Sequence, residues 1–390
     1  MNFDKKIDRR GTDSIKHNNL KERFSKEDIL PMWVADMDFK SPKKIVDALR
    51  KRVDEGIFGY VFTDKKIIES IYDWQKRRYG WSVKKGSIFL ANGVVPSIAF
   101  IINAFSKEGD EVIIQTPVYH PFARVIKESK RKVSANSLKI GEDGYEIDFK
   151  DLRKRAKKAK ILILCNPHNP TGKVYTKEEL EEIGNICLEN DLLIISDEIH
   201  SDFIFDDNKH IPIASLNKKF SKITFTLNAA SKSFNVAGLM TSYVICENKK
   251  LEAIYKNYVK RFDISDNNIF GPIALRVAYE SCEKWLDELV EYLQGNRDFA
   301  CEFIKDHIPI LDVKKPQATY LLWIDFRKLG LKSSKLEKFL INEAKLGLNN
   351  GIMFGKEGDG FARMNLGTQR ETIKEALENL KKAVDSLLAK

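Results

Sequence analysis

The chain has 390 residues, of which 43% are hydrophobic and 31% charged, and its formal net charge is +10. This length exceeds what one ordinary hydrophobic core supports, so we expect two domains that share an interface. The composition is that of a soluble globular protein, and no apolar run approaches the ~20 residues that span a bilayer. The charged start MNFDKKIDRRGTDSIKHNN does not resemble a signal peptide. We therefore expect a cytoplasmic protein that does not associate with membranes.

The positive charge is spread along the chain rather than gathered into a nucleic-acid-binding patch. Lysine pairs at 43, 65, 84 and 249 are interleaved with acidic residues. The densest basic block, KDLRKRAKKAK at 150–160, is typical of a solvated helix face. We therefore expect no nucleic-acid partner, although binding to RNA or DNA stays open as an alternative that a heparin or DNA column would test.

The five cysteines indicate reduced, structural thiols. They are widely spaced and form neither a C-x-x-C pair nor part of an H-E-x-x-H motif, so no metal site is expected. The cysteines are Cys165, Cys187, Cys246, Cys282 and Cys301.

Unbroken apolar runs in the middle of the chain predict strands that are buried on both faces, as in a mostly parallel sheet. The runs lie at 87–91, 111–115, 160–165, 191–196, 222–227 and 241–246. Stretches with helical spacing lie between many of them, including one after residue 97 and one at 176–190. The second begins with a capping-box pattern, Thr176 followed by Glu179. This alternation predicts an α/β domain over residues 46–280.

After residue 281 the pattern changes to a smaller α+β domain, which we place at 281–390. A long helical stretch, CEKWLDELVEYLQGNRDFACEFIKDH, comes first, followed by strand-like runs at ATYLLWIDF and GFARMNLG and a final helix from about residue 370. The loop-rich residues 1–45 fit neither pattern, and we expect them to pack with the smaller domain.

Several chemically distinctive residues follow predicted strands, where ligands bind in open α/β sheets. CNPHNPTGKVYT (165–176) follows one strand, and Asp197 in SDEIHSD ends the next. Asn92 and Gly93 precede a predicted helix, whose free N–H groups favour a phosphate. Lys232 lies in NAASKSFNVAGL (228–239). Each feature has an ordinary alternative: a plain turn, a solvated carboxylate, a hairpin or a surface lysine.

Taken together, these residues fit pyridoxal 5′-phosphate. That cofactor needs a lysine amine, an acidic partner for its ring nitrogen and an anion site for its phosphate. A dinucleotide or nucleoside triphosphate would require a G-x-G-x-x-G or Walker motif, and the sequence has neither.

The chain resembles the fold-type I pyridoxal-phosphate enzymes over nearly its whole length. Within them it resembles the MalY/PatB group of cystathionine β-lyases and cysteine desulfhydrases. The motifs that carry this resemblance are PMWVADMDFKSP, FGY, WQKRRYGW, NGVVPSI, TPVYHPF, NPHNPTG, SDEIHSDF and SKSFNVAGL, which occur in the family's order. The resemblance implies a large, mostly parallel α/β domain and a smaller α+β domain.

The resemblance also implies which residues bind the cofactor. Lys232 matches the Schiff-base lysine, Asp197 the partner of the ring nitrogen, and Asn169 the donor to the ring's phenolic oxygen. His200 stands where related aminotransferases carry a tyrosine near that oxygen, and Tyr119 matches the aromatic residue that stacks on the ring. Related aminotransferases often carry a basic phosphate-binding residue eight positions after the lysine, but this sequence has Met240 there. The phosphate is then expected to bind Val94, Val95, Ser231 and Tyr60.

For the substrate, the resemblance implies that Arg363 binds the α-carboxylate and that the backbone at Ala35 approaches it, with Tyr119 nearby. Tyr60 matches a tyrosine that reaches the phosphate of a neighbouring subunit, which implies a homodimer with shared sites. The ordinary alternatives are half-buried aromatic residues for Tyr60 and Tyr119, a structural ion pair for Arg363 and a hydrogen-bonded core histidine for His200.

Three functions are consistent with this site. A β-lyase would convert L-cystathionine, L-cysteine or a related S-substituted cysteine to pyruvate, ammonia and a thiol. A class I/II aminotransferase would share the early steps. A non-catalytic regulator on the same fold is disfavoured, because Lys232, Asp197, Asn169 and Arg363 are all present and no DNA-binding module is attached. The resemblance to the MalY/PatB group favours the lyase.

Overall fold

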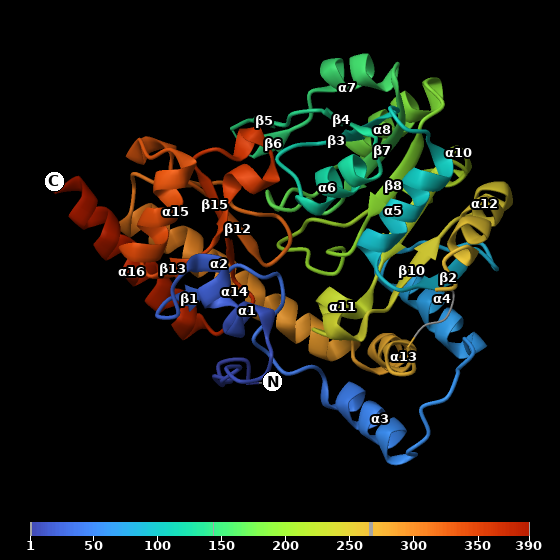
Figure 1. The fold of residues 1–390 in the computed structure, drawn as a ribbon, viewed down its shortest axis with the longest axis horizontal. Helices are drawn as coiled ribbons and strands as arrows, with labels where there is room; N and C mark the ends of the chain where they lie inside the picture. The colour runs from blue at the N-terminus through green and yellow to red at the C-terminus, as the bar shows by residue number, and fades with distance from the viewer. Residues whose placement is uncertain (1, 143, 265–267, 390) are drawn as a thin grey trace.

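The structure is a computed structural model that describes residues 2–142, 144–264 and 268–389. Within them, the largest sheet has the strand order β2-β10-β9-β8-β7-β3-β4 (Figure 1). Its strands are β2 (Ile88–Ala91), β3 (Glu111–Ile114), β4 (Lys132–Ala135), β7 (Ala159–Cys165), β8 (Leu193–Asp197), β9 (Thr224–Asn228) and β10 (Ser242–Ile245). Only β10 runs antiparallel to its neighbours, β2 and β9, so the mostly parallel sheet expected from the sequence is confirmed.

Both faces of this sheet are covered, which explains why its strands read as unbroken apolar runs. In β7, Ile161 and Ile163 belong to one buried cluster, and Leu162 and Leu164 belong to another on the opposite face. The helices around the sheet are α5 (Val94–Phe105), α6 (Pro121–Glu128), α7 (Phe149–Ala156), α8 (Lys177–Glu189), α12 (Lys249–Lys260) and α13 (Gly271–Ser281).

Of two helix features predicted from the sequence, the capping box of α8 is confirmed and the full length of the helix at 150–160 is not. Thr176 caps α8 as expected: its hydroxyl accepts from the Glu179 N–H at 3.2 Å, and its own N–H donates to the Glu179 carboxylate at 2.9 Å. The basic block at 150–160 is helical only as far as Ala156, and Ala159 already begins β7. The prediction of one helix face along the whole block is therefore wrong at its end, because burial of Ala159 in the sheet outweighs the local pattern.

The C-terminal part forms a second, antiparallel sheet with the order β11-β12-β15-β14. These strands are β11 (Asp312–Val313), β12 (Leu321–Asp325), β14 (Asn349–Asn350) and β15 (Phe361–Asn365), and the helices are α14 (Glu283–His307), α15 (Ser333–Asn342) and α16 (Arg370–Leu388). The long helix, both strand-like runs and the final helix therefore occur where the sequence predicts them.

The N-terminal residues contact this C-terminal part (Figure 1). Strand β1 (Leu30–Pro31) pairs in parallel with β13 (Leu346–Gly347), and Leu20 and Phe24 of α2 (Leu20–Phe24) pack with Ile341. Next to β1, residues 33–38 run across to the large sheet, where Asn235 holds the backbone of Met37. The domain boundaries at 45/46 and 280/281 stay a prediction.

Candidate active site

Three neighbouring strands place the predicted residues at one edge of the large sheet. Cys165, the last residue of β7, pairs in register with Asp197, the last residue of β8. Strand β9 ends at Asn228 and is followed directly by the short helix α11 (Ala230–Ser233), which carries Lys232. The carboxyl ends of parallel strands meet at the same edge of a sheet, so Asp197, the loop after Cys165 and Lys232 belong to one site.

Asp197 is a buried carboxylate that accepts few hydrogen bonds from the described part of the protein. It is 4% exposed, and the one donor to its side chain among the described residues is the Ile199 N–H at 3.1 Å. Burial raises the pKa of Asp197 to about 7. The alternative of a solvated carboxylate is therefore wrong, and the site would favour a cation next to this group.

Lys232 is half-buried, and its amine faces the segment around Ala35. Its Nζ donates to the Ala35 carbonyl at 2.5 Å. Removal of the amine from water, together with the positive charge of Arg363, lowers the pKa of Lys232 to about 8. A substantial fraction of this amine is therefore neutral near pH 8, the form that attacks an aldehyde or accepts a proton.

Arg363, in the middle of β15, is 3% exposed and has no carboxylate partner within the described residues. Its guanidinium donates to the Asn169 side-chain oxygen at 3.0 Å, and to the Trp33 carbonyl and the Asn349 side-chain oxygen at 2.8 Å each. Its Nε has no acceptor in the part of the chain that the structure describes, and burial lowers the pKa of Arg363 to about 10. The alternative of a structural ion pair is therefore wrong, and an anion would complete this site.

The aromatic residues expected at the cofactor lie nearby. The Tyr119 N–H donates to the Asn169 carbonyl at 3.0 Å, which joins the loops after β3 and β7. His200 is buried, and its Nδ1 has no hydrogen-bond partner in the described part of the protein. Burial holds the pKa of His200 well below its usual range, so the ring is neutral. A core histidine with satisfied hydrogen bonds, the alternative reading, does not describe this side chain.

The expected phosphate end lies at the start of α5. Val94 and Val95 are the first two residues of that helix, so their N–H groups lack helical partners. Gly93 precedes them with a φ of +146°, a conformation that side chains rarely adopt. Ser231 is half-buried next to Lys232, while Met240 is exposed and supplies no charge.

Tyr60 is not brought to the site within one chain. Its side chain is fully exposed in the segment between α3 (Lys43–Asp54) and α4 (Lys65–Tyr79). Ile57, Phe58 and Phe62 of the same segment are exposed as well.

Four residues that sequence reasoning did not assign complete the site. The Tyr320 hydroxyl donates to the Ala35 carbonyl at 3.0 Å, beside Lys232. The Asn365 amide donates to the carbonyls of Val34 and Asp36 at 2.5 and 2.7 Å. The Trp33 carbonyl and the Asn349 side chain hold Arg363, as described above. Trp33 lies in the recognised PMWVADMDFKSP motif, but nothing in the sequence marks Asn349 as a contact of Arg363.

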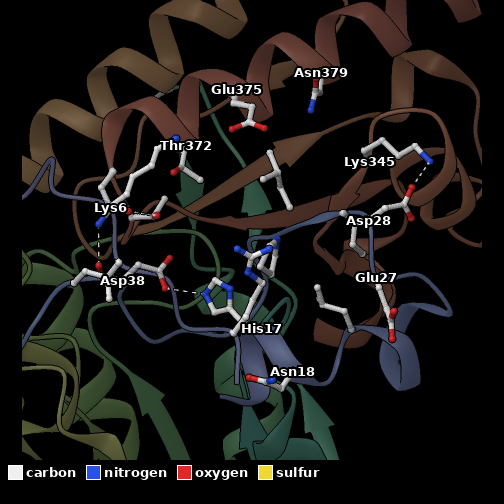
Figure 2. Close-up of a pocket in the computed structure, with 18 of the residues that line it drawn as sticks. Lys6, His17, Asn18, Glu27, Asp28, Asp38, Lys345, Thr372, Glu375 and Asn379 are labelled. Carbon is white, nitrogen blue, oxygen red and sulfur yellow. Dashed lines mark hydrogen bonds and ion pairs between the residues drawn. The ribbon is translucent and has the colours of Figure 1, made fainter. Parts of the chain in front are cut away.

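A separate cavity of about 810 Å³ lies between the N-terminal residues and α16 (Figure 2). His17 lies in its wall and contacts the Asp38 carboxylate at 3.1 Å, while Lys345 and Asp28 pair at 3.1 Å across from it. None of the predicted site residues lines this cavity. Behind its wall, the buried Lys16 contacts Asp38 at 2.6 Å, and Arg9 contacts it at 2.8 Å.

The described residues contain no cluster of three or more histidine, cysteine or acidic side chains placed to hold a metal. Across the same ranges, no helix has the length and apolar character needed to cross a membrane. All five cysteines are free thiols, and only Cys301 is not fully buried.

Comparison with known proteins identifies the family. The family described as aminotransferase class I and II matches residues 27–380. Cystathionine β-lyase PatB of Bacillus subtilis is 39% identical over 98% of this chain and 100% of its own.

Two solved structures have the same fold. Cystalysin from Treponema denticola, which contains pyridoxal 5′-phosphate, matches with a TM-score of 0.96 and 34% identity over 99% of each chain. A pyridoxal-phosphate-bound C–S lyase from Staphylococcus hominis, complexed with L-cycloserine, matches with a TM-score of 0.92 and 32% identity over 98% of each chain. The predicted fold type and cofactor are thereby confirmed. The chain belongs to the class I and II aminotransferase family and, within it, groups with the cystathionine β-lyases and C–S lyases.

Proposed function

We propose that the protein is a pyridoxal-phosphate-dependent carbon–sulfur β-lyase. It converts L-cystathionine, or a related S-substituted cysteine, to pyruvate, ammonia and a thiol. One observation carries the proposal: Asp197 and Lys232 lie at neighbouring strand ends of the large sheet, Arg363 of β15 contacts Asn169 in the loop after β7, and no opposite charge among the described residues pairs with any of the three. An amino-acid substrate and an anionic cofactor with a basic ring nitrogen supply the missing partners.

The residues present fit the cofactor. Asp197 would face the ring nitrogen, because a cation there removes the cost of burying its carboxylate. The N–H groups of Val94 and Val95, with Ser231, would hold the phosphate. Tyr119 would cover the ring, and Asn169 and the neutral His200 would lie near its phenolic oxygen. When bound, pyridoxal 5′-phosphate accepts the electron pair left behind when the substrate's Cα–H bond breaks.

The chain's own groups then perform three tasks. Arg363 binds the α-carboxylate through its fork of N–H groups and so fixes the orientation of the Cα–H bond. Lys232 takes the Cα proton, since its lowered pKa leaves part of the amine neutral. The Ala35 carbonyl, which accepts from both Lys232 and Tyr320, holds the amine in place beside the substrate.

The family also contains aminotransferases, whose reaction would share the early steps described above. The two reactions separate in one experiment: incubation with L-cystathionine, and separately with L-cysteine, in the absence of any 2-oxo acid. A lyase releases pyruvate and a thiol or sulfide over many turnovers per protomer. An aminotransferase stops after one turnover and resumes only when a 2-oxo acid is added, and that result would overturn the proposed lyase.

The proposal includes a homodimer with shared sites. It is supported by the segment at 57–62, which exposes four apolar or aromatic side chains (Ile57, Phe58, Tyr60 and Phe62) that a second copy would cover. Mixing inactive Tyr60→Ala with inactive Lys232→Ala protomers should restore activity, because one site of the hybrid is intact. No recovery despite demonstrated subunit exchange would contradict shared sites. A cytoplasmic location also stays a prediction.

A further inference from the structure

His120 connects the buried carboxylate-binding arginine with the protein surface. It directly follows Tyr119, and the centroids of the two rings lie 5.5 Å apart. The centroids of the His120 and Phe354 rings lie 5.9 Å apart in an edge-to-face arrangement. The Arg363 guanidinium lies 5.1 Å from the centroid of the same Phe354 ring. His120 and Arg363 therefore pack on one shared aromatic side chain, with His120 the more exposed of the two.

Two further arginines lie on the solvent side of this pair. Arg124 is one helical turn after His120 in α6, and its N–H donates to the His120 carbonyl at 3.3 Å. Arg23 comes from α2, and its guanidinium contacts the Met353 sulfur at 3.5 Å, immediately before Phe354 in the chain. Arg23 thus contacts the residue before Phe354, and Arg124 lies one turn after His120, whose ring packs against Phe354.

The charges of these arginines are only loosely compensated. Arg23 lies 3.5 Å from Glu337, and Arg124 lies 3.4 Å from Glu128. Their side chains are 29% and 57% exposed, so both can turn towards a ligand. Burial, followed by the charges of Arg363, Arg124 and Arg23, lowers the pKa of His120 to about 4. The field of all three arginines therefore reaches the imidazole, which is itself neutral at physiological pH and whose buried Nδ1 has no partner among the described residues.

We infer that Arg23 and Arg124, beside His120, form a subsite for a carboxylate at the far end of the substrate's sulfur substituent. The inference rests on the proposed function, in which Arg363 binds the α-carboxylate. A substrate with a carboxylate at each end would extend from Arg363 past His120 to the outer arginines. L-Cystathionine carries such a second carboxylate and L-cysteine does not, so the subsite selects a class among the S-substituted cysteines.

Two synthetic substrates separate the effect of the distal negative charge from the effect of substrate shape. S-Carboxymethyl-L-cysteine and S-carbamoylmethyl-L-cysteine have nearly the same shape, and only the first carries a distal carboxylate. The holoenzyme should prefer the carboxylate by about 3- to 10-fold in kcat/KM at low ionic strength, mainly through KM, because partly exposed charges interact at this scale. The preference should fall towards one in 0.5 M NaCl, at which screening is effective over roughly 4 Å.

Variants then assign the preference to residues. Arg23→Gln and Arg124→Gln should each reduce it, and the double variant should abolish it while leaving kcat/KM for the carbamoylmethyl substrate within about 2-fold. Arg124→Lys keeps the charge and should keep most of the preference. Lys154→Gln, an exposed lysine on α7, is the matched control for the loss of one positive charge. Thermal denaturation checks that all variants remain folded.

The subsite would be overturned if the unaltered enzyme had nearly equal kcat/KM values for the carboxymethyl and carbamoylmethyl substrates. It would also be overturned if the ratio of these two values were unchanged in the double variant. Failure of the proposed function looks different: neither thioether would yield pyruvate. Calorimetric titration of the holoenzyme with the two compounds gives their affinity ratio even then, and equal affinities would likewise overturn the subsite.

Discussion

Asp38 and Asp197 are both buried carboxylates, yet the protein treats their charges in opposite ways. Asp38 is surrounded by Lys16, Arg9 and His17, and despite its burial they hold the pKa of this carboxyl well below its usual range. Among the described residues no such cation contacts Asp197, and burial raises its pKa to about 7. The charge of Asp38 is neutralised by other residues of the chain, while the charge of Asp197 would be neutralised only by a bound cation. This difference separates a structural cluster from a binding site.

The largest effect expected on the binding-site side comes from Lys232→Ala. Loss of both the covalent attachment point and the proton acceptor should reduce lyase activity by more than about a thousand-fold. The free energy of unfolding should change little, because the Lys232 residue as a whole is only half-buried and takes part in no ion pair among the described residues. Steady-state pyruvate release and urea denaturation would measure the two quantities. Lys154→Ala, far from the site, should match the unaltered enzyme in both.

On the structural side, Asp38→Asn should reduce the free energy of unfolding by about 3–5 kcal/mol, because it leaves the buried Lys16 without its carboxylate. Asp197→Asn, by contrast, should not destabilise the cofactor-free protein, since no cation there loses a partner. Denaturant melts of the two variants compare them directly. Equal losses of stability would contradict the distinction drawn between these carboxylates.

Two buried arginines offer the same comparison. Arg363→Lys keeps the charge but loses the fork of donors, so kcat/KM should fall by about a hundred-fold for every amino-acid substrate. Arg297 is equally buried but pairs with Asp206 at 2.7 Å, and Arg297→Lys should affect stability rather than kcat/KM. Unchanged kinetics in Arg363→Lys would show that another group binds the α-carboxylate.

The raised pKa of Asp197 predicts a pH dependence. Between about pH 4 and pH 7 the unfolded chain has already lost this proton while the folded chain still holds it, so stability falls as pH rises. The cofactor-free protein should therefore lose about 2 kcal/mol between pH 5 and pH 8 relative to Asp197→Asn. Saturating pyridoxal 5′-phosphate should remove most of this difference. Parallel pH profiles of the two cofactor-free proteins would contradict it.

The smallest effect should come from His17→Gln. Its ring is 19% exposed, and Asp38 retains Lys16 and Arg9 after the substitution. The free energy of unfolding should change by less than about 1 kcal/mol. A loss comparable to that of Asp38→Asn would mean that His17, rather than Lys16, neutralises the carboxylate.

The sequence predicted the site better than it predicted the structural cluster. Asp197 ends a recognisable strand, Asn169 and Lys232 follow two others, and the parallel sheet brings such strand ends to one edge. The roles proposed for them, and for Arg363, stay predictions that the experiments above address. The mostly parallel sheet was predictable for a similar reason, since alternate residues of β7 are buried on opposite faces.

The remaining contacts depend on packing between segments that are distant in sequence. Lys16 reads as a surface lysine in IKHNN, yet it is 1% exposed against Asp38. Asn349 and Tyr320 gain their contacts only when the C-terminal sheet packs beside residues 33–36. No local pattern encodes that placement, because it follows from how the two sheets and the N-terminal segment meet.

Reduction of the holoenzyme with borohydride, followed by peptide mapping, tests the central claim most directly. Borohydride fixes the cofactor to whichever lysine holds it. With 49 lysine residues in the chain, a single modified position is highly discriminating. We predict that the pyridoxyl group is found on Lys232 at about one per protomer. A label on any other lysine, or no label in a protein with bound cofactor, would contradict the account.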